Sequence, residues 1–282
     1  MSNFRKLSIG ATELIALQET WARRDPIESF PMSTLEEWQP FRHLLDTDGL
    51  FTMNLGVWLI RSEGKSILVD SGIGFRDAQT ARLPIEVPPV FPMMLAKVGV
   101  QPADIDLVVH THLHFDHTGW NTLEQDGANV PHFPNAKHVV QRAEWEFWTA
   151  TDERKGIAFY DQVLEPIERS GQLELFDGDY TATAHVSSIP TRGHTVGHVS
   201  YVLASEGERV YILGDAAHSP AQVNRPDWSL WVDIDKELSA SGRDELFRSA
   251  EREGALIASG HFPYPGLGYA EQRNGQRVFR PI

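Results

Sequence analysis

One short stretch of the chain carries a high density of side chains that can bind a metal ion. His112, His114, Asp116 and His117 lie within six residues, after the largely apolar run 105–109, which predicts a buried strand. Side chains two residues apart in an extended segment point the same way, so His112 and His114 can close on one ion. Asp116 and His117 follow in a predicted turn, where they can face a second ion.

The donor types limit which metal this stretch can bind. Imidazole and carboxylate without sulfur suit zinc, manganese, iron or cobalt, and the order of affinities does not choose among them. The chain has no cysteine, which excludes thiolate ligands and disulfides. A solvated, histidine-rich turn is the alternative, but four such side chains together favour a metal site.

The motif Thr111 to His117 resembles the signature of the metallo-β-lactamase superfamily of hydrolases. Further motifs of that family follow in the same order, namely Gly193-His194-Thr195-Val196-Gly197-His198, Gly214-Asp215 and Gly260-His261. The resemblance implies one metal held by His112, His114 and His194 and a second held by Asp116, His117 and His261. Asp215 would bridge the two metals.

The resemblance also implies supporting roles for two side chains. Asp70 ends a predicted strand and is expected to accept a proton from a ligand histidine, which fixes the tautomer of that ring. An ordinary turn aspartate is the alternative. His198 lies four residues after His194 and is expected to form buried hydrogen bonds rather than to bind metal.

Two side chains are expected to take part in catalysis. Asp116 can receive the proton of the attacking water and return it to the leaving group. His218 lies three residues beyond Asp215, where N-acyl homoserine lactonases carry a tyrosine that contacts the substrate carbonyl. The sequence departs from the lactonase pattern at this position, and His218 is expected to hydrogen-bond the substrate or leaving group.

The order of apolar segments predicts an α/β fold. Strands are expected at 6–18, 54–61, 66–70, 105–109, 137–141, 172–176, 185–189, 199–203, 209–213 and 255–258, and helices at 93–98, 142–149, 157–170 and 242–253. Two groups of strands, each followed by helices, indicate two sheets packed face to face with helices outside. This is the αββα sandwich of two mixed β-sheets that the resemblance also implies.

The chain is expected to form a single domain over residues 1–282, because no low-complexity linker divides it. An irregular, aromatic-rich segment at about 20–49 is expected either to roof the active site or to meet a second subunit, with an irregular packed loop as the alternative. A proline-rich stretch at 75–102 is expected to lie beside the site. Trp145 and Trp148 are expected in the core, and Trp228 and Trp231 are candidate pocket walls.

The net charge of the chain and its N-terminal sequence indicate which partners and which cellular compartment to expect. The 39 acidic and 25 basic residues give a formal charge of −14, which argues against a nucleic-acid surface. The start of the chain shows no apolar signal core, and no apolar run approaches membrane-spanning length. We therefore expect a cytoplasmic protein with a small-molecule substrate and no membrane partner.

The stretch His261 to Gly268 resembles the terminal motif of the branch that contains N-acyl homoserine lactonases and methyl parathion hydrolase. The resemblance implies a homodimer with two divalent ions, zinc in the first place and manganese, iron or cobalt as alternatives. The expected reaction is attack by a metal-bridging hydroxide on a small, fairly apolar ester or lactone. One alternative is an aryl phosphotriester hydrolase. Another is a non-hydrolytic metal-binding or redox protein on the same fold, although oxygen-reducing relatives replace the second histidine with glutamate, and here it is the intact His114.

Overall fold

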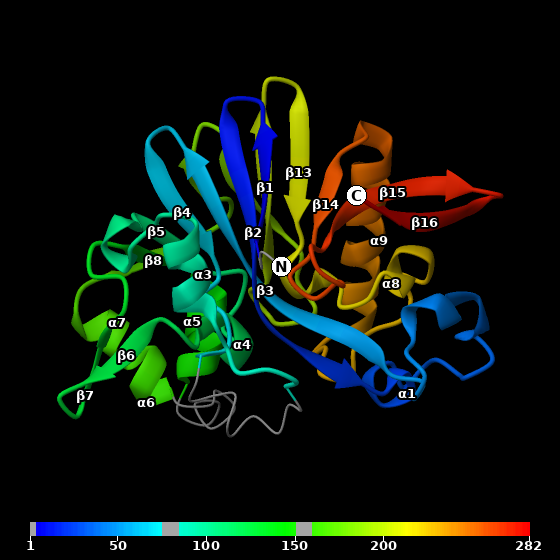
Figure 1. Cartoon of the computed structure of the whole chain (residues 1–282), viewed down its shortest axis with the longest axis horizontal. Helices are drawn as coiled ribbons and strands as arrows, with labels where there is room; N and C mark the ends of the chain where they lie inside the picture. Colours follow the sequence, from blue (N-terminus) through cyan, green and yellow to red (C-terminus); the bar gives the residue numbers. More distant parts are fainter. Residues whose placement is uncertain (1–3, 75–84, 151–159) are drawn as a thin grey trace.

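The computed structural model describes residues 4–74, 85–150 and 160–282 (Figure 1). The first of its two large sheets has the strand order β1-β2-β3-β4-β5-β8-β9, and the second has the order β10 to β16. The first sheet contains β1 (Phe4–Ile9), β2 (Thr12–Arg24), β3 (Phe51–Ser62), β4 (Lys65–Val69), β5 (Leu107–Val109), β8 (Lys137–Gln141) and β9 (Leu173–Phe176). The second contains β10 (Thr181–Thr183), β11 (Val186–Pro190), β12 (Val199–Ser205), β13 (Glu208–Ile212), β14 (Leu256–Ala258), β15 (Leu267–Arg273) and β16 (Gln276–Pro281).

The helices are short apart from one. They are α1 (Pro26–Ser29), α3 (Phe91–Lys97), α4 (Phe115–Thr118), α5 (Arg142–Thr149), α6 (Tyr160–Val163), α7 (Glu165–Arg169), α8 (Ala221–Asn224) and α9 (Lys236–Glu253), with the 3-10 turns η1 (Gln39–Leu44), η2 (Pro102–Asp104) and η4 (Gly214–Ala216). A separate hairpin pairs β6 (Thr122–Gln125) with β7 (Ala128–Pro131). None of the described helices has the length and apolar run needed to cross a membrane.

Both large sheets are mixed. In the first, β1 to β4 are antiparallel neighbours, and β4, β5, β8 and β9 run parallel. In the second, β13 and β14 are parallel and the other neighbours are antiparallel. Parallel strands end at the same edge, so the loops after β4, β5, β13 and β14 can meet there.

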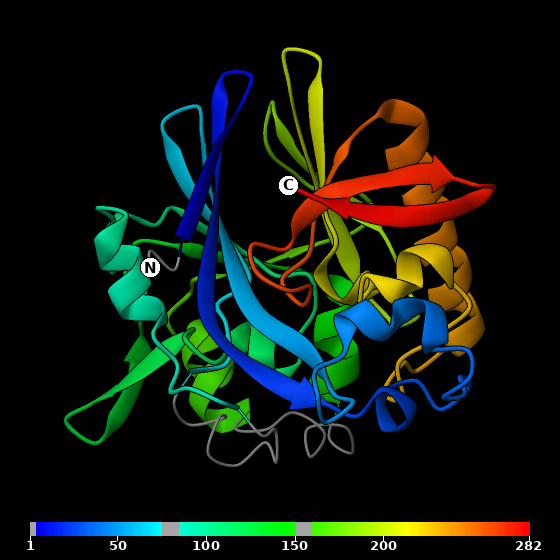
Figure 2. The ribbon, with the colours of Figure 1, turned by 45° about the vertical axis from the view of Figure 1, so that its right-hand side comes forward.

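The sheets pack face to face, with helices on the outer faces. Trp58 and Val109 of the first sheet share a buried cluster with Tyr201 and Ile212 of the second. On the outer faces α3 packs on the first sheet and α9 on the second, and Figures 1 and 2 show these helices on opposite sides of the molecule. The predicted αββα sandwich is therefore confirmed.

Local sequence accounts for the longest helix. The Asp235 side chain accepts a hydrogen bond from the backbone N of Leu238 and caps the N-terminus, and Gly254 ends the helix in the left-handed conformation at φ 59°. The helix begins at Lys236, earlier than the predicted start at residue 242. The prediction relied on the apolar stripe and missed the cap.

The predicted helix at 157–170 is also different in the structure. Its first residues, 157–159, lie outside the described residues, and the rest forms α6 and α7 with a break at Leu164. Pro166 lies in the first turn of α7. Proline lacks a backbone N–H, so Pro166 cannot donate to the carbonyl of Gln162, and this missing helical hydrogen bond explains the break.

The aromatic-rich segment packs into the molecule. Strand β2 extends to Arg24, so residues 20–24, predicted to be irregular, pair with β3 instead. Beyond them the buried side chains Phe30 and Trp38 form an aromatic cluster with Phe51 and Trp228. Both ribbon views show β2 running out toward α1 (Figures 1 and 2). Of the proline-rich stretch predicted at 75–102, residues 75–84 lie outside the described residues.

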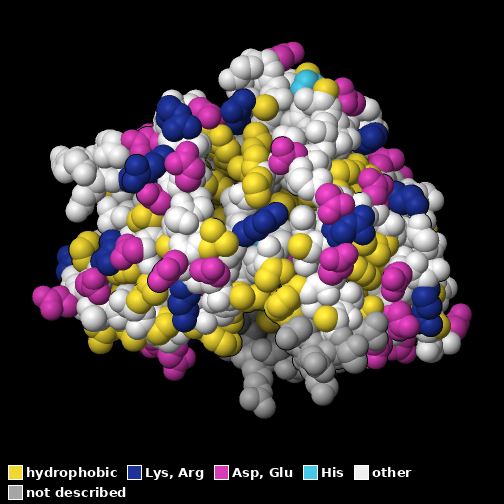
Figure 3. All heavy atoms as spheres, turned by 180° about the vertical axis from the view of Figure 1, so that it is seen from behind, with side chains coloured by type: hydrophobic (Ala, Val, Ile, Leu, Met, Phe, Trp, Pro, Cys, Tyr) yellow, Lys and Arg dark blue, Asp and Glu magenta, His cyan; other side chains and the backbone are white. Residues whose placement is uncertain are grey.

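Charged side chains of both signs are scattered over the molecular surface. On the face shown in Figure 3, Lys and Arg side chains lie among Asp and Glu, and over its described part they form no continuous stripe. A nucleic-acid groove would need such a stripe.

Candidate metal centre

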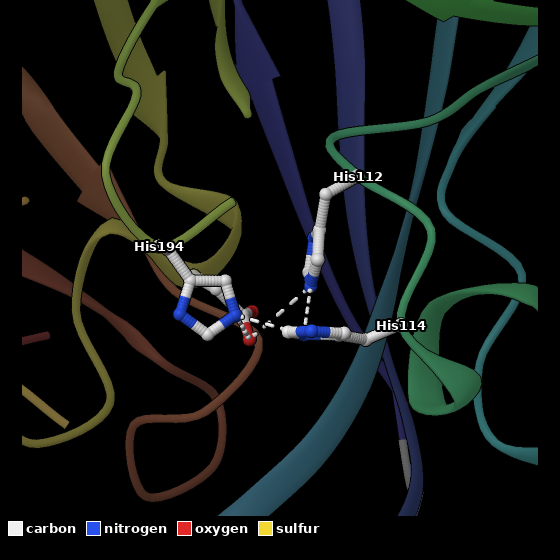
Figure 4. A group of neighbouring side chains, drawn as sticks. His112, His114 and His194 are labelled. Carbon is white, nitrogen blue, oxygen red and sulfur yellow. Dashed lines mark hydrogen bonds and ion pairs between the residues drawn. The ribbon is translucent and has the colours of Figure 1, made fainter. Parts of the chain in front are cut away.

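The first-sheet ligands come from the segment after β5. His112 and His114 lie in the loop that follows Val109, and both rings point to one centre (Figure 4). Asp116 and His117 lie on α4, a single helical turn, rather than in the predicted turn. His112 and His117 are buried, so the segment delivers its donors to the interior rather than to solvent.

The second-sheet ligands come from three separate loops. His194 lies between β11 and β12, Asp215 on η4 directly after β13, and His261 directly after β14. A Cβ atom on Gly193 would lie 2.2 Å from the backbone N of Ser239, so only glycine lets the His194 loop pass this close. All three side chains are buried.

Three imidazole nitrogens meet at the first centre. Nδ1 of His114 lies 2.9 Å from Nε2 of His112 and 2.9 Å from Nε2 of His194. Oδ2 of Asp215 lies 3.1 Å from Nε2 of His194 and 3.6 Å from Nε2 of His112. These four donor atoms lie close enough to surround one cation.

The second centre uses the other oxygen of the same carboxylate. Oδ1 of Asp215 lies 3.0 Å from Nε2 of His117 and 2.8 Å from Nε2 of His261. Oδ2 of Asp116 lies 3.6 Å from Nε2 of His117 and 3.9 Å from Nε2 of His261. Asp215 therefore touches both groups, one with each oxygen, which is the arrangement that the bridging role requires.

The hydrogen bonds behind these rings show that the donors fit metal ions. Nδ1 of His117 faces Asp70, Nδ1 of His194 faces Asp233, and Nδ1 of His261 faces the backbone O of Asn54. Each partner is an acceptor, so each Nδ1 carries the proton. In the neutral rings each Nε2 then presents a lone pair toward the Asp215 carboxylate. A cation between these acceptor atoms removes the repulsion between them.

The pKa shifts of the histidines reflect the close approach of their nitrogens to Asp215. Burial lowers the pKa of His194, but the charges of Asp215 and Asp233 outweigh it and raise the pKa to about 9. His117 and His261 are raised for the same reason, chiefly by Asp215 against the cost of burial. His112, held by burial and by neighbouring histidines, has a pKa well below its usual value. Asp215 therefore favours the charged form of His117, His194 and His261, whereas burial keeps His112 neutral.

Asp70 and His198 both form hydrogen bonds beside the candidate ligands. Asp70 accepts from Nδ1 of His117 at 2.8 Å and from the backbone N of Thr111 at 2.8 Å. His198 is fully buried, and its Nε2 accepts from the backbone N of Asp215 at 2.9 Å. The structure thus brings both side chains into contact with the candidate ligands or their backbone.

His218 also reaches the shared carboxylate. Its Nε2 lies 3.0 Å from Oδ2 of Asp215, and its ring stacks on that of His261 at 4.9 Å between centroids. Burial lowers the pKa of His218 to about 4, so the ring is neutral at neutral pH. A third group of candidate ligand atoms in the described residues is Asp215, His218 and His261.

Three buried carboxylates that support the centre were missed by sequence reasoning. Asp233 accepts from Nδ1 of His194 at 2.8 Å and pairs with the buried Arg243 at 3.2 Å. Glu144 and Glu19 accept backbone N–H groups from the loops beside the ligands. None of the three lies in a recognisable motif. Each has polar or charged residues nearby in the sequence, so no local pattern marks it as buried.

A cavity of about 480 Å³ opens onto both metal groups. Its apolar walls include Met53, Phe115 and Leu230, and Trp231 joins them as the sequence analysis proposes, whereas Trp228 is buried in the aromatic cluster. A larger cavity of about 670 Å³ near η1, α8 and β16 contains none of the candidate ligands. Donor chemistry, rather than size, identifies the functional cavity.

Comparison with known proteins agrees with this geometry. A curated relative, an N-acyl homoserine lactonase of Bacillus cereus, is 28% identical over 242 residues, which is 80% of this chain and 86% of the relative. The AttM lactonase of Rhizobium johnstonii is 30% identical over 178 residues, 59% of this chain and 61% of that protein. The predicted resemblance to the lactonase branch is therefore confirmed. The predicted enzyme class, a metal-dependent hydrolase, is confirmed as well.

Solved structures share the whole fold. The dizinc quorum-quenching lactonase AidC, in complex with a product, aligns with a TM-score of 0.84 at 23% identity over 100% of this chain and 98% of that one. AbOPH, a hydrolase of the β-lactamase superfamily, aligns with the same score at 24% identity and the same coverage. The family model for the metallo-beta-lactamase superfamily matches residues 57–261, from β3 to the last candidate ligand. This chain therefore belongs to the metallo-beta-lactamase superfamily.

Proposed function

We propose that this protein is a dinuclear metal-dependent hydrolase of small, fairly apolar esters or lactones. The observation that carries the proposal is the convergence of two groups of donor atoms on the two oxygens of Asp215. The imidazole-rich donor set and the dizinc relative favour zinc. When bound, the two ions supply a water-derived nucleophile at neutral pH and a Lewis acid for the substrate oxygen.

The chain contributes to the proposed reaction by orienting the histidine rings that would hold the metal ions. The hydrogen bonds of Asp70, Asp233 and the Asn54 carbonyl fix the tautomer and ring plane of His117, His194 and His261. The lone pairs are therefore in place before a substrate enters, and little reorganisation is needed during the reaction.

Asp116 is the proposed proton carrier. It lines the cavity beside His261, so its carboxylate is within reach of both the metal group and a bound substrate. It can accept the proton of the attacking water and pass it to the alcohol that leaves. The alcohol oxygen of an ester or lactone is a poor leaving group without this proton.

His218 is the second proposed catalytic side chain. Its ring lines the cavity and its Nε2 contacts Asp215. We assign it two tasks, which are to orient the shared carboxylate and to border the bound substrate. The walls formed by Met53, Phe115 and Trp231 exclude water from the apolar part of the substrate.

Initial rates test the proposal. Zinc-loaded protein is given an N-acyl homoserine lactone, a simple aryl ester and an aryl phosphotriester, with Asp116→Ala protein as control. We expect the lactone or the ester to react faster than the phosphotriester and the variant to lose the activity. A dominant phosphotriester rate would replace this proposal with the aryl phosphotriester alternative, and no turnover of any substrate by the two-metal protein would contradict both.

A further inference from the structure

Arg24 is a cation in the candidate site that forms no ion pair among the described residues. It is the last residue of β2, is half-buried, and lines the same cavity as His114, Asp116 and Asp215. Within the described part of the chain it has no hydrogen bond or ion pair to another side chain. Among the described residues that line the cavity, Arg24 holds the only permanent positive charge.

The other shielded arginines of the described chain are all paired. Each one that is buried or half-buried forms an ion pair with an acidic side chain, and these are Arg23, Arg61, Arg142, Arg225, Arg243, Arg277 and Arg280. Removing a guanidinium from water costs free energy that a carboxylate partner returns. Arg24 has no such partner in the described part of the chain, so its guanidinium is free to pair with an acidic group of a ligand in the cavity.

Strand geometry turns Arg24 toward the cavity. In the antiparallel register Arg24 is opposite Phe51, and Ala22 is opposite Met53. Residues two apart share a face, so Arg24 and Met53 lie on the same face, and both line the cavity. Arg23 points to the opposite face, where it pairs with Asp46 at 2.6 Å.

Given the proposed hydrolase function, we propose that Arg24 is a specificity-determining residue that binds an acidic group of the substrate outside the scissile ester or lactone. The substrate class is then a carboxylate-bearing ester or lactone with an apolar segment between the two groups. The apolar segment lies against Met53, Phe115 and Leu230, which line the space shared by Arg24 and the metal groups. The planar guanidinium donates two parallel hydrogen bonds to a carboxylate, a geometry that lysine does not offer.

The electrostatics of the cavity agree with an anionic ligand. The carboxylates of Asp116 and Asp215 belong to the metal groups, and two divalent ions outweigh their charge. The formal charge of −14 on the whole chain repels anions only weakly inside the cavity, because salt screens surface charges beyond about 8 Å at physiological ionic strength.

Binding of dicarboxylates tests this inference without turnover. Titration calorimetry on zinc-loaded protein compares glutarate, adipate, pimelate and suberate with the monocarboxylate of the same chain length. One carboxylate of each compound serves the metal centre, so the second reports on Arg24. We expect at least one dicarboxylate to bind about tenfold or more tightly than its monocarboxylate, as a charge-assisted hydrogen bond predicts.

Variants assign the preference to one side chain. Arg24→Gln should remove the preference for the dicarboxylate and change the monocarboxylate affinity by less than about twofold. Arg24→Lys should keep part of the preference for the dicarboxylate. Arg23→Gln is the matched control, because it removes the same charge from the next residue on the opposite face, and it should keep the full preference. No preference in the unchanged protein, or one that survives Arg24→Gln in protein with an unaltered circular dichroism spectrum, overturns the inference.

A kinetic experiment connects the inference to the reaction. The substrates are para-nitrophenyl hexanoate and the mono-para-nitrophenyl ester of adipic acid, which differ in the end of the acyl chain. Arg24→Gln should raise KM for the acidic ester and leave kcat/KM for the neutral ester within about twofold; equal losses on both esters contradict a specificity role. If neither ester reacts, the proposed function fails on these substrates, and the calorimetry still decides the role of Arg24.

Discussion

Two buried glutamates lie beside the two metal groups, and they differ in what they join. Glu144, which we name the cross-sheet glutamate, accepts from the backbone N of Leu113 at 3.1 Å and of Gly197 at 2.9 Å. Leu113 lies in the loop after β5 of the first sheet, and Gly197 lies in the loop before β12 of the second. One carboxylate therefore connects the loop of His112 and His114 with the loop of His194.

Glu19, which we name the same-sheet glutamate, joins loops of the first sheet alone. It accepts from the backbone N of Ile73 at 2.8 Å and of Gly74 at 3.1 Å, in the loop after β4. It also accepts from the indole N–H of Trp120, shortly after α4. The cross-sheet glutamate has a matching indole donor, Trp148, on its own helix at 2.6 Å.

The difference shows how each metal group is assembled. In the first group, the side chain of Glu144 joins the loops of the two sheets. In the second group, the distant candidate ligand His261 is held by Asn54 of β3 without a carboxylate. The side-chain amide of Asn54 donates to the backbone O of Gly260, its backbone N donates to the backbone O of His261, and its backbone O accepts from Nδ1 of His261. We therefore expect the first group to be more sensitive to loss of a single buried carboxylate than the second.

The largest expected effect tests whether both groups are needed at all. Asp116→Ala removes a donor from the second group and the proposed proton carrier, so turnover should fall by about 1000-fold or more. Initial rates and metal content by mass spectrometry measure it. The shared Asp215 stays in place, so the first group should keep its ion. Near-normal turnover with two ions bound would refute the two-metal scheme.

The next effect tests the cross-sheet glutamate. Glu144→Ala leaves the buried N–H groups of Leu113 and Gly197 without an acceptor, so we expect a loss of about 3–5 kcal/mol in the free energy of unfolding. Denaturant unfolding measures it. Glu146→Ala, on the exposed side of the same helix, should change stability by less than about 0.5 kcal/mol. Equal losses of unfolding free energy in Glu144→Ala and Glu146→Ala would contradict the special role of the cross-sheet glutamate.

The same-sheet glutamate should make stability depend on pH. Burial raises the pKa of Glu19 from 4.5 to about 7. The folded state therefore holds a proton that the unfolded state releases between these values, and stability falls as pH rises through this window and levels off above about 7. The change is about 3 kcal/mol.

Comparison with Glu19→Gln isolates that dependence. The unfolding free energy of the unchanged protein minus that of Glu19→Gln, measured from about pH 5 to 8, should fall as pH rises to about 7 and stay constant above it. Exposed Glu36 provides the control, since Glu36→Gln should leave the profile parallel to that of the unchanged protein. A flat difference would show that the three N–H donors keep Glu19 ionised throughout.

The smallest effect compares the carboxylates behind the ligand rings. Asp70→Asn and Asp233→Asn each replace the acceptor of a ligand Nδ1–H, and each should weaken metal binding by about 10-fold to 100-fold. Chelator competition measures it. Asp70→Asn should affect the second group, through His117, and Asp233→Asn the first, through His194. Loss of both ions together in either variant would show that the groups do not behave separately.

Parts of the site could be predicted from the sequence because short spacings determine them. His112, His114, Asp116 and His117 share one loop and one helical turn, so their proximity follows from local geometry. Strands such as β8 and helices such as α5 also match their predicted bounds, because their apolar pattern is local. The family motifs added the distant candidate ligands, and the structure brings their side chains together.

Other features depend on contacts between segments far apart in the chain. Asp233 lies 39 residues from His194, Glu144 lies 53 residues from Gly197, and Glu19 lies 101 residues from Trp120. The presence of an acidic residue in the sequence does not show whether its side chain will be buried. Only packing decides which carboxylates lose their water and gain N–H donors.

The sequence by itself predicted the fold class and the candidate ligands between His112 and His117, because periodicity and local spacing encode them, and the family resemblance gave the order of the distant candidate ligands. The tertiary structure alone decided which oxygen of Asp215 faces each group, that three buried carboxylates support the groups, and that Arg24 lines the cavity with no ion pair among the described residues. The physical reason is that these properties depend on burial and on distances across two sheets. Neither quantity is set by residues that are neighbours in the chain.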